Sequence, residues 1–152
     1  MSAKHSAAAG HRARSLARRL ALQALYQLQI NPRSLQETQR QFAADPEAER
    51  VDVDYFQQLL VAIASSREAL DARLARLCEI PPAELDPIEH AVLWLGLHEL
   101  EAYPELPYRV ALAEAVQLAK QFGATDGHKF VNAVLDRAAQ ELRPHEYGQT
   151  IE

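Results

Sequence analysis

The sequence predicts an all-α fold, a compact helical bundle of about six to seven helices, and three observations indicate it. Apolar residues recur every three or four positions in several segments, as they do on one face of a helix. No segment alternates apolar and polar residues with the period of two that is typical of a strand. Glycine is scarce, at 5 of 152 residues, whereas alanine and leucine, which favour helices, are abundant.

The N-terminal part of the chain is expected to hold a flexible tail and two helices. Residues 1–10 are small and polar without periodicity, which is typical of a flexible tail. Residues 12–30 place an apolar residue at every fourth position, and this predicts a helix that ends at Asn31-Pro32. A capping box then predicts a short second helix over residues 34–43.

The middle of the chain predicts a long helical segment followed by a central helix. Residues 52–78 keep a spacing of three and four, as one long helix or as two helices joined near Ser65-Ser66. Asp86-Pro87-Ile88-Glu89 is a strong helix start, in which Asp caps, Pro takes the first helical position and Glu reaches back. The following IEHAVLWLGLHEL is apolar almost all round, so this helix is expected at the centre of the bundle.

Two more helices and the turn between them complete the predicted fold. Pro107 is expected to open a helix that ends at Gly123, a residue suited to a left-handed C-terminal cap. Asp126 or Thr125 is expected to cap the last helix, which Pro144 stops.

The net charge of −5 is divided unevenly along the chain. Residues 1–33 carry six basic and no acidic side chains, a charge of +6. Residues 34–152 hold the other 10 of the 16 basic side chains and all 21 acidic ones, so their charge is 10 − 21 = −11. This asymmetry suggests a polyanionic partner at the basic end, although a solvated basic helix without a partner explains it equally well.

Several functional classes find no support in the sequence. A single cysteine, Cys78, rules out an internal disulfide. The first residues lack the apolar centre of a signal peptide, and no apolar run approaches the roughly 20 residues that span a membrane, so a cytoplasmic protein is expected. His90 and His98 lie too far apart around one helix to share a metal ion. We therefore expect no metal, no cofactor and no catalytic residue.

Residues 123–130, GATDGHKF, have the composition of a phosphate-binding loop but not its spacing. A Walker A loop has four residues between its glycines, followed by Lys and Ser or Thr, whereas three residues separate Gly123 from Gly127 and a histidine precedes Lys129. A turn between two helices is the simpler interpretation. Lys129 would lie in the first turn of a helix, where the dipole favours anions, which hints at a phosphate nearby.

An arginine-rich helix that bears a tyrosine points to one kind of phosphate ligand. Arginine binds phosphate as a planar fork, and aromatic rings stack on unpaired bases. Together these residue types suit single-stranded RNA.

Four stretches of the sequence resemble the bacterial transcription antitermination factor NusB family. HRARSLARRLALQALYQLQ is similar to the opening helix of that family, and VALAEAVQLAKQFGATDGHKFVNAVLDRAA to its closing signature. DVDYFQQLLVAIA and ELDPIEHAVLWLGLHELE match in pattern and spacing between them. The resemblance covers about residues 11–144, which it implies to be a single NusB-like domain of two packed helical subdomains without catalysis. Residues 145–152 then form a C-terminal tail.

The resemblance also implies a function and its partners. Family members pair with a small-subunit ribosomal protein, also called NusE, and together bind the single-stranded boxA element of nascent ribosomal RNA, so that RNA polymerase reads through terminators in ribosomal RNA operons. The first helix and the last turn are expected to form one RNA-binding surface. Carried over by position, the RNA-binding residues are Arg12, Arg14, Arg18, Arg19, Tyr26, Phe122, Asp126, Lys129 and Phe130.

Some of these assignments leave an alternative open. Phe122 and Phe130 could equally be core residues, and Gly127 stands where relatives often have serine. Glu89 on the central helix is the candidate for the ribosomal-protein contact. The alternative for the whole chain is a helical protein–protein interaction module without RNA binding of its own.

Overall fold

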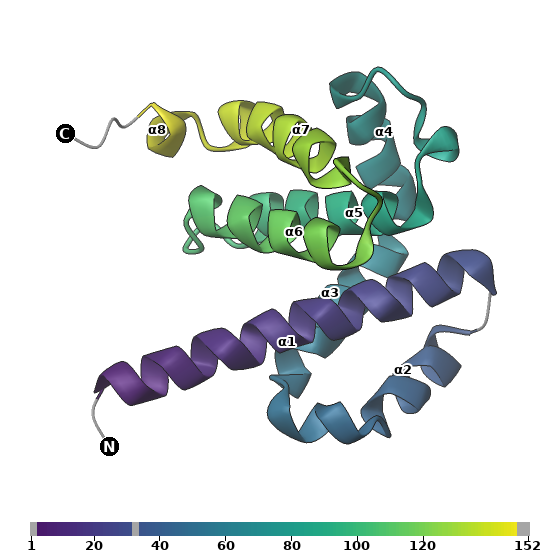
Figure 1. The fold of residues 1–152 in the computed structure, drawn as a ribbon, viewed down its shortest axis with the longest axis vertical. Coiled ribbons are helices and arrows are strands. Elements are labelled where there is room, and N and C mark those ends of the chain that lie inside the picture. Colours follow the sequence, from purple (N-terminus) through teal and green to yellow (C-terminus); the bar gives the residue numbers. More distant parts are fainter. Residues whose placement is uncertain (1–2, 32–33, 149–152) are drawn as a thin grey trace. The chain divides into compact units, whose positions relative to one another are not determined.

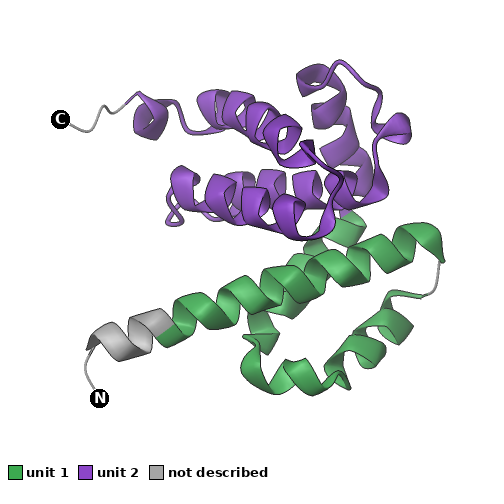
Figure 2. Ribbon diagram, in the orientation of Figure 1, with its two compact units in different colours: residues 1–65 green, residues 66–152 purple. Residues whose placement is uncertain are grey.

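The computed structural model describes residues 3–31 and 34–148, and within these residues it contains helices and no strand (Figure 1). This confirms the all-α prediction. The chain divides into two compact units, residues 1–65 and residues 66–152 (Figure 2).

The first unit contains three α-helices and one short 3-10 helix: α1 (Ala3–Ile30), α2 (Leu35–Ala43), η1 (Pro46–Arg50) and α3 (Val53–Ser65). Helix α1 packs along α3, and both bury their apolar faces. Ser34 caps α2 as predicted, since the Glu37 N–H donates to the Ser34 hydroxyl at 3.1 Å.

Helix α1 starts at Ala3, nine residues before Arg12, where the sequence predicts its start. The helix therefore includes residues 3–10, for which a flexible tail was expected. The physical reason is that three alanines at positions 7–9 have the highest helix propensity and extend a helix that is already nucleated by the apolar face further along. Small side chains without an apolar stripe do not by themselves indicate a tail.

The second unit contains α4 (Arg67–Leu77), η2 (Pro82–Glu84), α5 (Pro87–Ala102), α6 (Tyr108–Phe122), α7 (Gly127–Leu142) and α8 (Pro144–Tyr147). The segment 52–78 is therefore two helices, which end and begin around Ser66. Helix α5 contacts α4, α6 and α7, and every residue from Ala91 to Leu97 is buried, so the prediction of a central helix is confirmed.

Close packing of α5 against α7 depends on Gly96. A Cβ atom on this residue would lie 2.5 Å from Cδ1 of Leu135, which is itself fully buried. Glycine therefore lets the two helix backbones approach one another where a side chain would need space.

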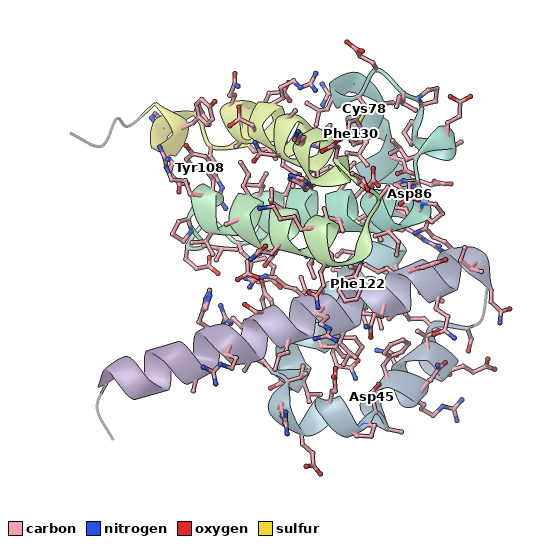
Figure 3. All side chains as sticks on the ribbon, viewed as in Figure 1. Asp45, Cys78, Asp86, Tyr108, Phe122 and Phe130 are labelled. Atoms are coloured by element: carbon pink, nitrogen blue, oxygen red, sulfur yellow. The ribbon has the colours of Figure 1, made fainter. Side chains whose placement is uncertain are left out.

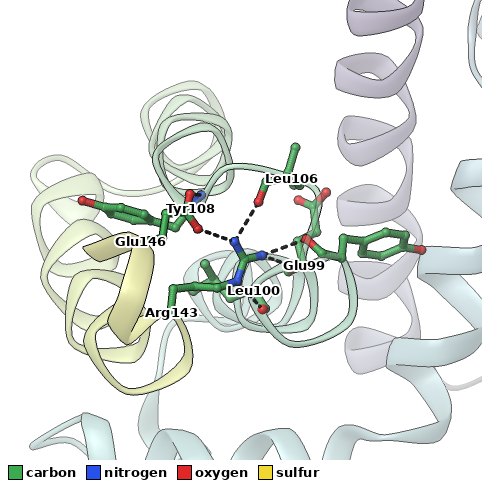
Figure 4. Close-up of polar contacts among 7 residues, drawn as sticks. Glu99, Leu100, Leu106, Tyr108, Arg143 and Glu146 are labelled. Carbon is green, nitrogen blue, oxygen red and sulfur yellow. Dashed lines mark hydrogen bonds and ion pairs between the residues drawn. The ribbon is translucent and has the colours of Figure 1, made fainter. Parts of the chain in front are cut away.

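A buried arginine between α7 and α8 links them to the C-terminal end of α5 (Figure 4). Arg143 is 8 % exposed and donates to the carbonyls of Leu100 at 3.0 Å and of Leu106 and Tyr103 at 2.8 Å. It also pairs with the Glu146 carboxylate at 2.7 Å. The carbonyls that close a helix have no partner within it, and Arg143 supplies one.

Helix α8 corrects the prediction of a C-terminal tail that starts at residue 145. Pro144 ends α7 as expected, but it also takes the first position of a new turn of helix, where proline is favoured. This turn is held in place because Glu146 accepts from the Tyr108 N–H at 2.8 Å, and the Tyr147 hydroxyl donates to Asp136 at 2.9 Å. In the part of the chain that is described, no helix is both long and apolar enough to cross a membrane.

Candidate nucleic-acid interface

The basic residues of α1 lie against the start of α3. The Arg14 guanidinium carbon lies 4.8 Å from the centre of the Tyr55 ring, and that of Arg18 lies 5.4 Å from it. Arg14 Nε also lies 3.8 Å from an Asp52 carboxylate oxygen. The Asp52 N–H donates to the carbonyl of Ala13 at 3.1 Å, which links the two helices directly. Cation–π contacts and this link therefore orient the cationic face of α1.

The four predicted arginines of α1 differ in exposure. Arg12 and Arg14 are exposed and Arg19 is half-buried, whereas Arg18 is only 2 % exposed. A guanidinium that a phosphate is to reach must be accessible, so Arg12 and Arg14 are the better candidates for direct contact. Arg18 packs over Tyr55, and its assignment as an RNA contact stays a prediction.

Three residues near this surface were missed by the sequence reasoning. Asp52 and Tyr55 hold Arg14, and Arg50 lines a surface hollow together with Ala9, Arg12, Ala13 and Leu16. Asp52 and Tyr55 lie in the DVDYF stretch that matches the family in pattern, which was the available signal. Nothing local in the sequence marks Arg50.

Tyr26 lies half-buried near the C-terminal end of α1. It lines a shallow hollow with Gln23, Gln27 and the exposed Ile30. A hollow that combines an aromatic ring, amide groups and an aliphatic side chain can accept the face and the edge of a nucleobase.

The turn between α6 and α7 carries the predicted contacts of the second unit, and its backbone differs from the prediction. Gly123 has φ −86° and ψ −178°, which is extended and not left-handed. The left-handed residue is Asp126, with φ 66°, a conformation that Asp adopts more readily than most residues. Its carboxylate makes no capping hydrogen bond to α7 and lies 3.2 Å from the Lys129 ammonium. The glycine permitted a left-handed cap but did not require one.

Lys129 is the most accessible cation of this turn, with 72 % of its side chain exposed. Phe122, the last residue of α6, and Phe130, in the first turns of α7, are both half-buried (Figure 3). Partial burial leaves both interpretations of these rings open, because a half-exposed ring can pack on one face and stack on a base with the other.

Glu89 lies against this turn in the second unit. The Ala124 N–H donates to its Oε2 at 3.4 Å, and a Cβ atom on Gly127 would lie 2.6 Å from the same oxygen. The Asp86 carboxylate caps α5 as expected, since it accepts from the N–H groups of Ile88 and Glu89. Burial raises the pKa of Glu89, the Ala124 hydrogen bond lowers it, and the nearby Asp86 carboxylate raises it further.

Other polar side chains of the second unit are engaged locally. Asp71 accepts from the Trp94 indole at 2.8 Å, and its Oδ1 lies 2.6 Å from Nε2 of His90. Burial lowers the pKa of His98 and raises that of the Cys78 thiol. Within residues 3–31 and 34–148, no group of three or more His, Cys, Asp and Glu side chains could hold a metal ion.

Comparisons with known proteins identify relatives over almost the whole chain. The profile of the NusB family matches residues 15–140. The transcription antitermination protein NusB of Methylobacillus flagellatus is 46% identical over 145 residues, which cover 95% of this chain and 94% of the relative. The protein of the same description from Hahella chejuensis is 46% identical over 133 residues, with 88% and 89% covered.

Two solved structures resemble the fold of this chain. NusB of T. maritima superposes with a TM-score of 0.74 at 26% identity and covers 84% of this chain and 90% of that one. A structure of the antitermination factors NusB and NusE in complex with dsRNA contains a chain with a TM-score of 0.73 at 21% identity, with 84% and 96% covered. At that identity the second likeness supports the fold alone.

Proposed function

The chain belongs to the NusB family, and we propose from this that it is a transcription antitermination factor. It binds the single-stranded boxA element of nascent ribosomal RNA together with a small-subunit ribosomal protein, NusE. In this complex it promotes read-through by RNA polymerase in ribosomal RNA operons, without catalysing a reaction itself and acting in the cytoplasm. The observation that carries the proposal is the match over residues 15–140 to a family whose curated members are named transcription antitermination proteins.

The exposed cations of both units support RNA as one of the ligands. Arg12 and Arg14 in the first unit and Lys129 in the second are all exposed, as phosphate-binding groups must be. Phosphate contacts supply much of the affinity for nucleic acid and make it salt-dependent. Tyr26 offers a ring for a base. That one RNA strand contacts the predicted residues of both units stays a prediction.

The acidic remainder of the chain supports a basic protein as the second partner. Residues 34–152 carry a charge of −11, which attracts and orients a basic protein such as a ribosomal protein during association. The assignment of Glu89 to this contact also stays a prediction.

A binding measurement at several salt concentrations tests the proposal. A short single-stranded boxA RNA is titrated with the protein, alone and with NusE, and compared with the double-stranded form of the same sequence. We expect Arg12→Ala with Arg14→Ala to weaken binding of the single strand. Removal of two phosphate contacts should flatten the salt slope by about 1.4, since each contact contributes about 0.7 on single strands.

Arg40→Ala is the matched control, because Arg40 is an exposed arginine on α2 outside the predicted surface. It should change neither the affinity nor the slope. Wild-type protein that binds NusE but no RNA, even in the presence of NusE, would instead identify a protein–protein interaction module.

A further inference from the structure

One carboxylate touches both sides of the turn that carries the candidate RNA contacts of the second unit. Glu89, in the first turn of α5, accepts from the backbone N–H of Ala124 at 3.4 Å. Its carboxylate also lies against Gly127, the first residue of α7, where an added Cβ would meet Oε2 at 2.6 Å and Cδ at 2.7 Å. Glu89 and this turn lie far apart in the sequence and are brought together by the packing of α5 on α6 and α7.

The backbone hydrogen bonds of the turn itself are short-range. The Gly123 N–H donates to Ala119 at 2.8 Å, and the Gly127 N–H donates to Ala124 at 3.0 Å. Between them, Asp126 adopts φ 66°, which costs an L-residue free energy that the surroundings must offset. The Glu89 contact is a long-range restraint on this segment, and Asp126 and Lys129 follow Ala124 by two and five residues.

We propose that Glu89 is a positioning residue, which fixes the turn 123–126 so that Asp126 and Lys129 are held in place for RNA, and that Gly127 is required to leave room for its carboxylate. This inference rests on the proposed RNA-binding function. It gives Glu89 a role through its own chain, in place of the ribosomal-protein contact that the sequence suggested.

The same arrangement changes how the start of α7 can meet a phosphate. Anions are favoured at a helix N-terminus, and here the Glu89 carboxylate already lies beside its first residue. An RNA phosphate is therefore received by the exposed ammonium of Lys129 and not by the free N–H groups of the helix.

The test combines a structural readout without RNA and an affinity. In Glu89→Ala, hydrogen exchange at the Ala124 amide should accelerate, and RNA affinity should fall about five- to tenfold as the competent turn becomes a minor conformation. Glu89→Gln retains a side-chain oxygen that accepts from Ala124, so both measurements should stay near wild type. Glu141→Ala removes an exposed glutamate of α7 and is the charge-matched control, which should change neither.

A double-mutant cycle with Gly127 checks the second half of the proposal. Gly127→Ala alone should weaken RNA binding, because its Cβ displaces the carboxylate. Combined with Glu89→Ala it should add nothing to the loss that Glu89→Ala causes, since both changes remove the same restraint. If the loss of RNA affinity in the double variant equals the product of the losses in the two single variants, the proposed pairing of Glu89 and Gly127 is wrong.

The outcomes separate this inference from the proposed function. If wild-type protein binds no RNA, the proposed function fails, while Ala124 exchange still tests the restraint. Unchanged exchange in Glu89→Ala would overturn the inference. A second result would also overturn it: both Glu89 variants bind NusE more weakly, while the protein alone binds RNA as tightly as wild type. That result would instead identify Glu89 as the ribosomal-protein contact.

Discussion

The two ends of α5 are each linked to a neighbouring segment by one charged side chain, but the two links differ in burial and in the number of hydrogen bonds. At the C-terminal end, Arg143 is 8 % exposed and donates to four backbone carbonyls and to Glu146. At the N-terminal end, Glu89 is half-buried and accepts one hydrogen bond of 3.4 Å from Ala124.

This difference indicates a division between stability and function within one unit. A buried cation with several acceptors becomes costly to remove, because its partners are left buried without it. A half-buried carboxylate with one long hydrogen bond contributes little to the free energy of unfolding, but it can still determine the conformation of an exposed turn. The end of α5 that faces the predicted RNA contacts is thus the one that is held more weakly.

The largest effect is expected at Arg143. Arg143→Met should lower the free energy of unfolding by about 3–5 kcal/mol, because Glu146 and the carbonyls at the end of α5 lose their donor. Denaturant unfolding measures this loss. Arg137→Met is the control, since Arg137 is an exposed arginine of α7, the helix that precedes Arg143, and should change stability by less than about 0.5 kcal/mol. Equal losses from the two variants would remove the distinction between the ends.

The next largest effect is expected at Gly96, in the part of α5 that lies between its two ends. Gly96→Ala should cost about 1–3 kcal/mol, because the new Cβ overlaps the buried Leu135 side chain. Shortening the neighbour in Gly96→Ala with Leu135→Val should recover part of the loss. A single Gly96→Ala substitution that leaves the unfolding midpoint unchanged would show that α5 and α7 move apart easily, and that Glu89 is not held by the helix packing.

The helices of this fold were predictable because their signals are local. Asp86-Pro87 starts α5 as expected, since a capping carboxylate and a proline at the first helical position act within one turn. Helix spacing identified the segment 52–78 but left open whether it is one helix or two helices joined near Ser65-Ser66, because no proline or glycine marks the break that the structure has there. The extension of α1 to Ala3 was missed because alanine propensity is weak evidence without a buried face.

The contacts of the candidate site were less predictable because they join segments far apart in sequence. Residue types and the family resemblance identified Arg14 and Lys129, but neither shows that Tyr55 lies under Arg14. Glu89 was noticed for its position in a helix start, whereas its partner, Ala124, becomes visible only when α5 packs on α6 and α7. A backbone N–H is present at almost every residue, so sequence alone cannot indicate which one a carboxylate will reach.

Lowering the pH should destabilise the fold through His98, which lies in the C-terminal half of α5. Burial lowers the pKa of this histidine from 6.5, so the folded protein binds its proton less readily than the unfolded chain does. The stability contributed by neutral His98 is therefore lost as the pH falls through about 6.5. His98→Gln should flatten the decline of the melting temperature between about pH 8 and pH 5.5. A variant with the same slope as wild type would exclude His98 as the cause.

The smallest effect on stability is expected from the titration of Glu89, and its sign is opposite to that of His98. Burial, against the weaker effect of the Ala124 hydrogen bond, raises its pKa above 4.5. The folded state therefore takes up a proton more readily than the unfolded chain, and Glu89 adds stability as the pH falls through that raised pKa. Glu89→Gln cannot take up this proton, so its melting temperature relative to wild type should be highest near neutral pH and should decline on acidification toward pH 4.5. A constant difference across the same range would mean that the pKa of Glu89 is the same in the folded and unfolded states, so that the effects of burial and of Asp86 on it are fully offset by the Ala124 hydrogen bond.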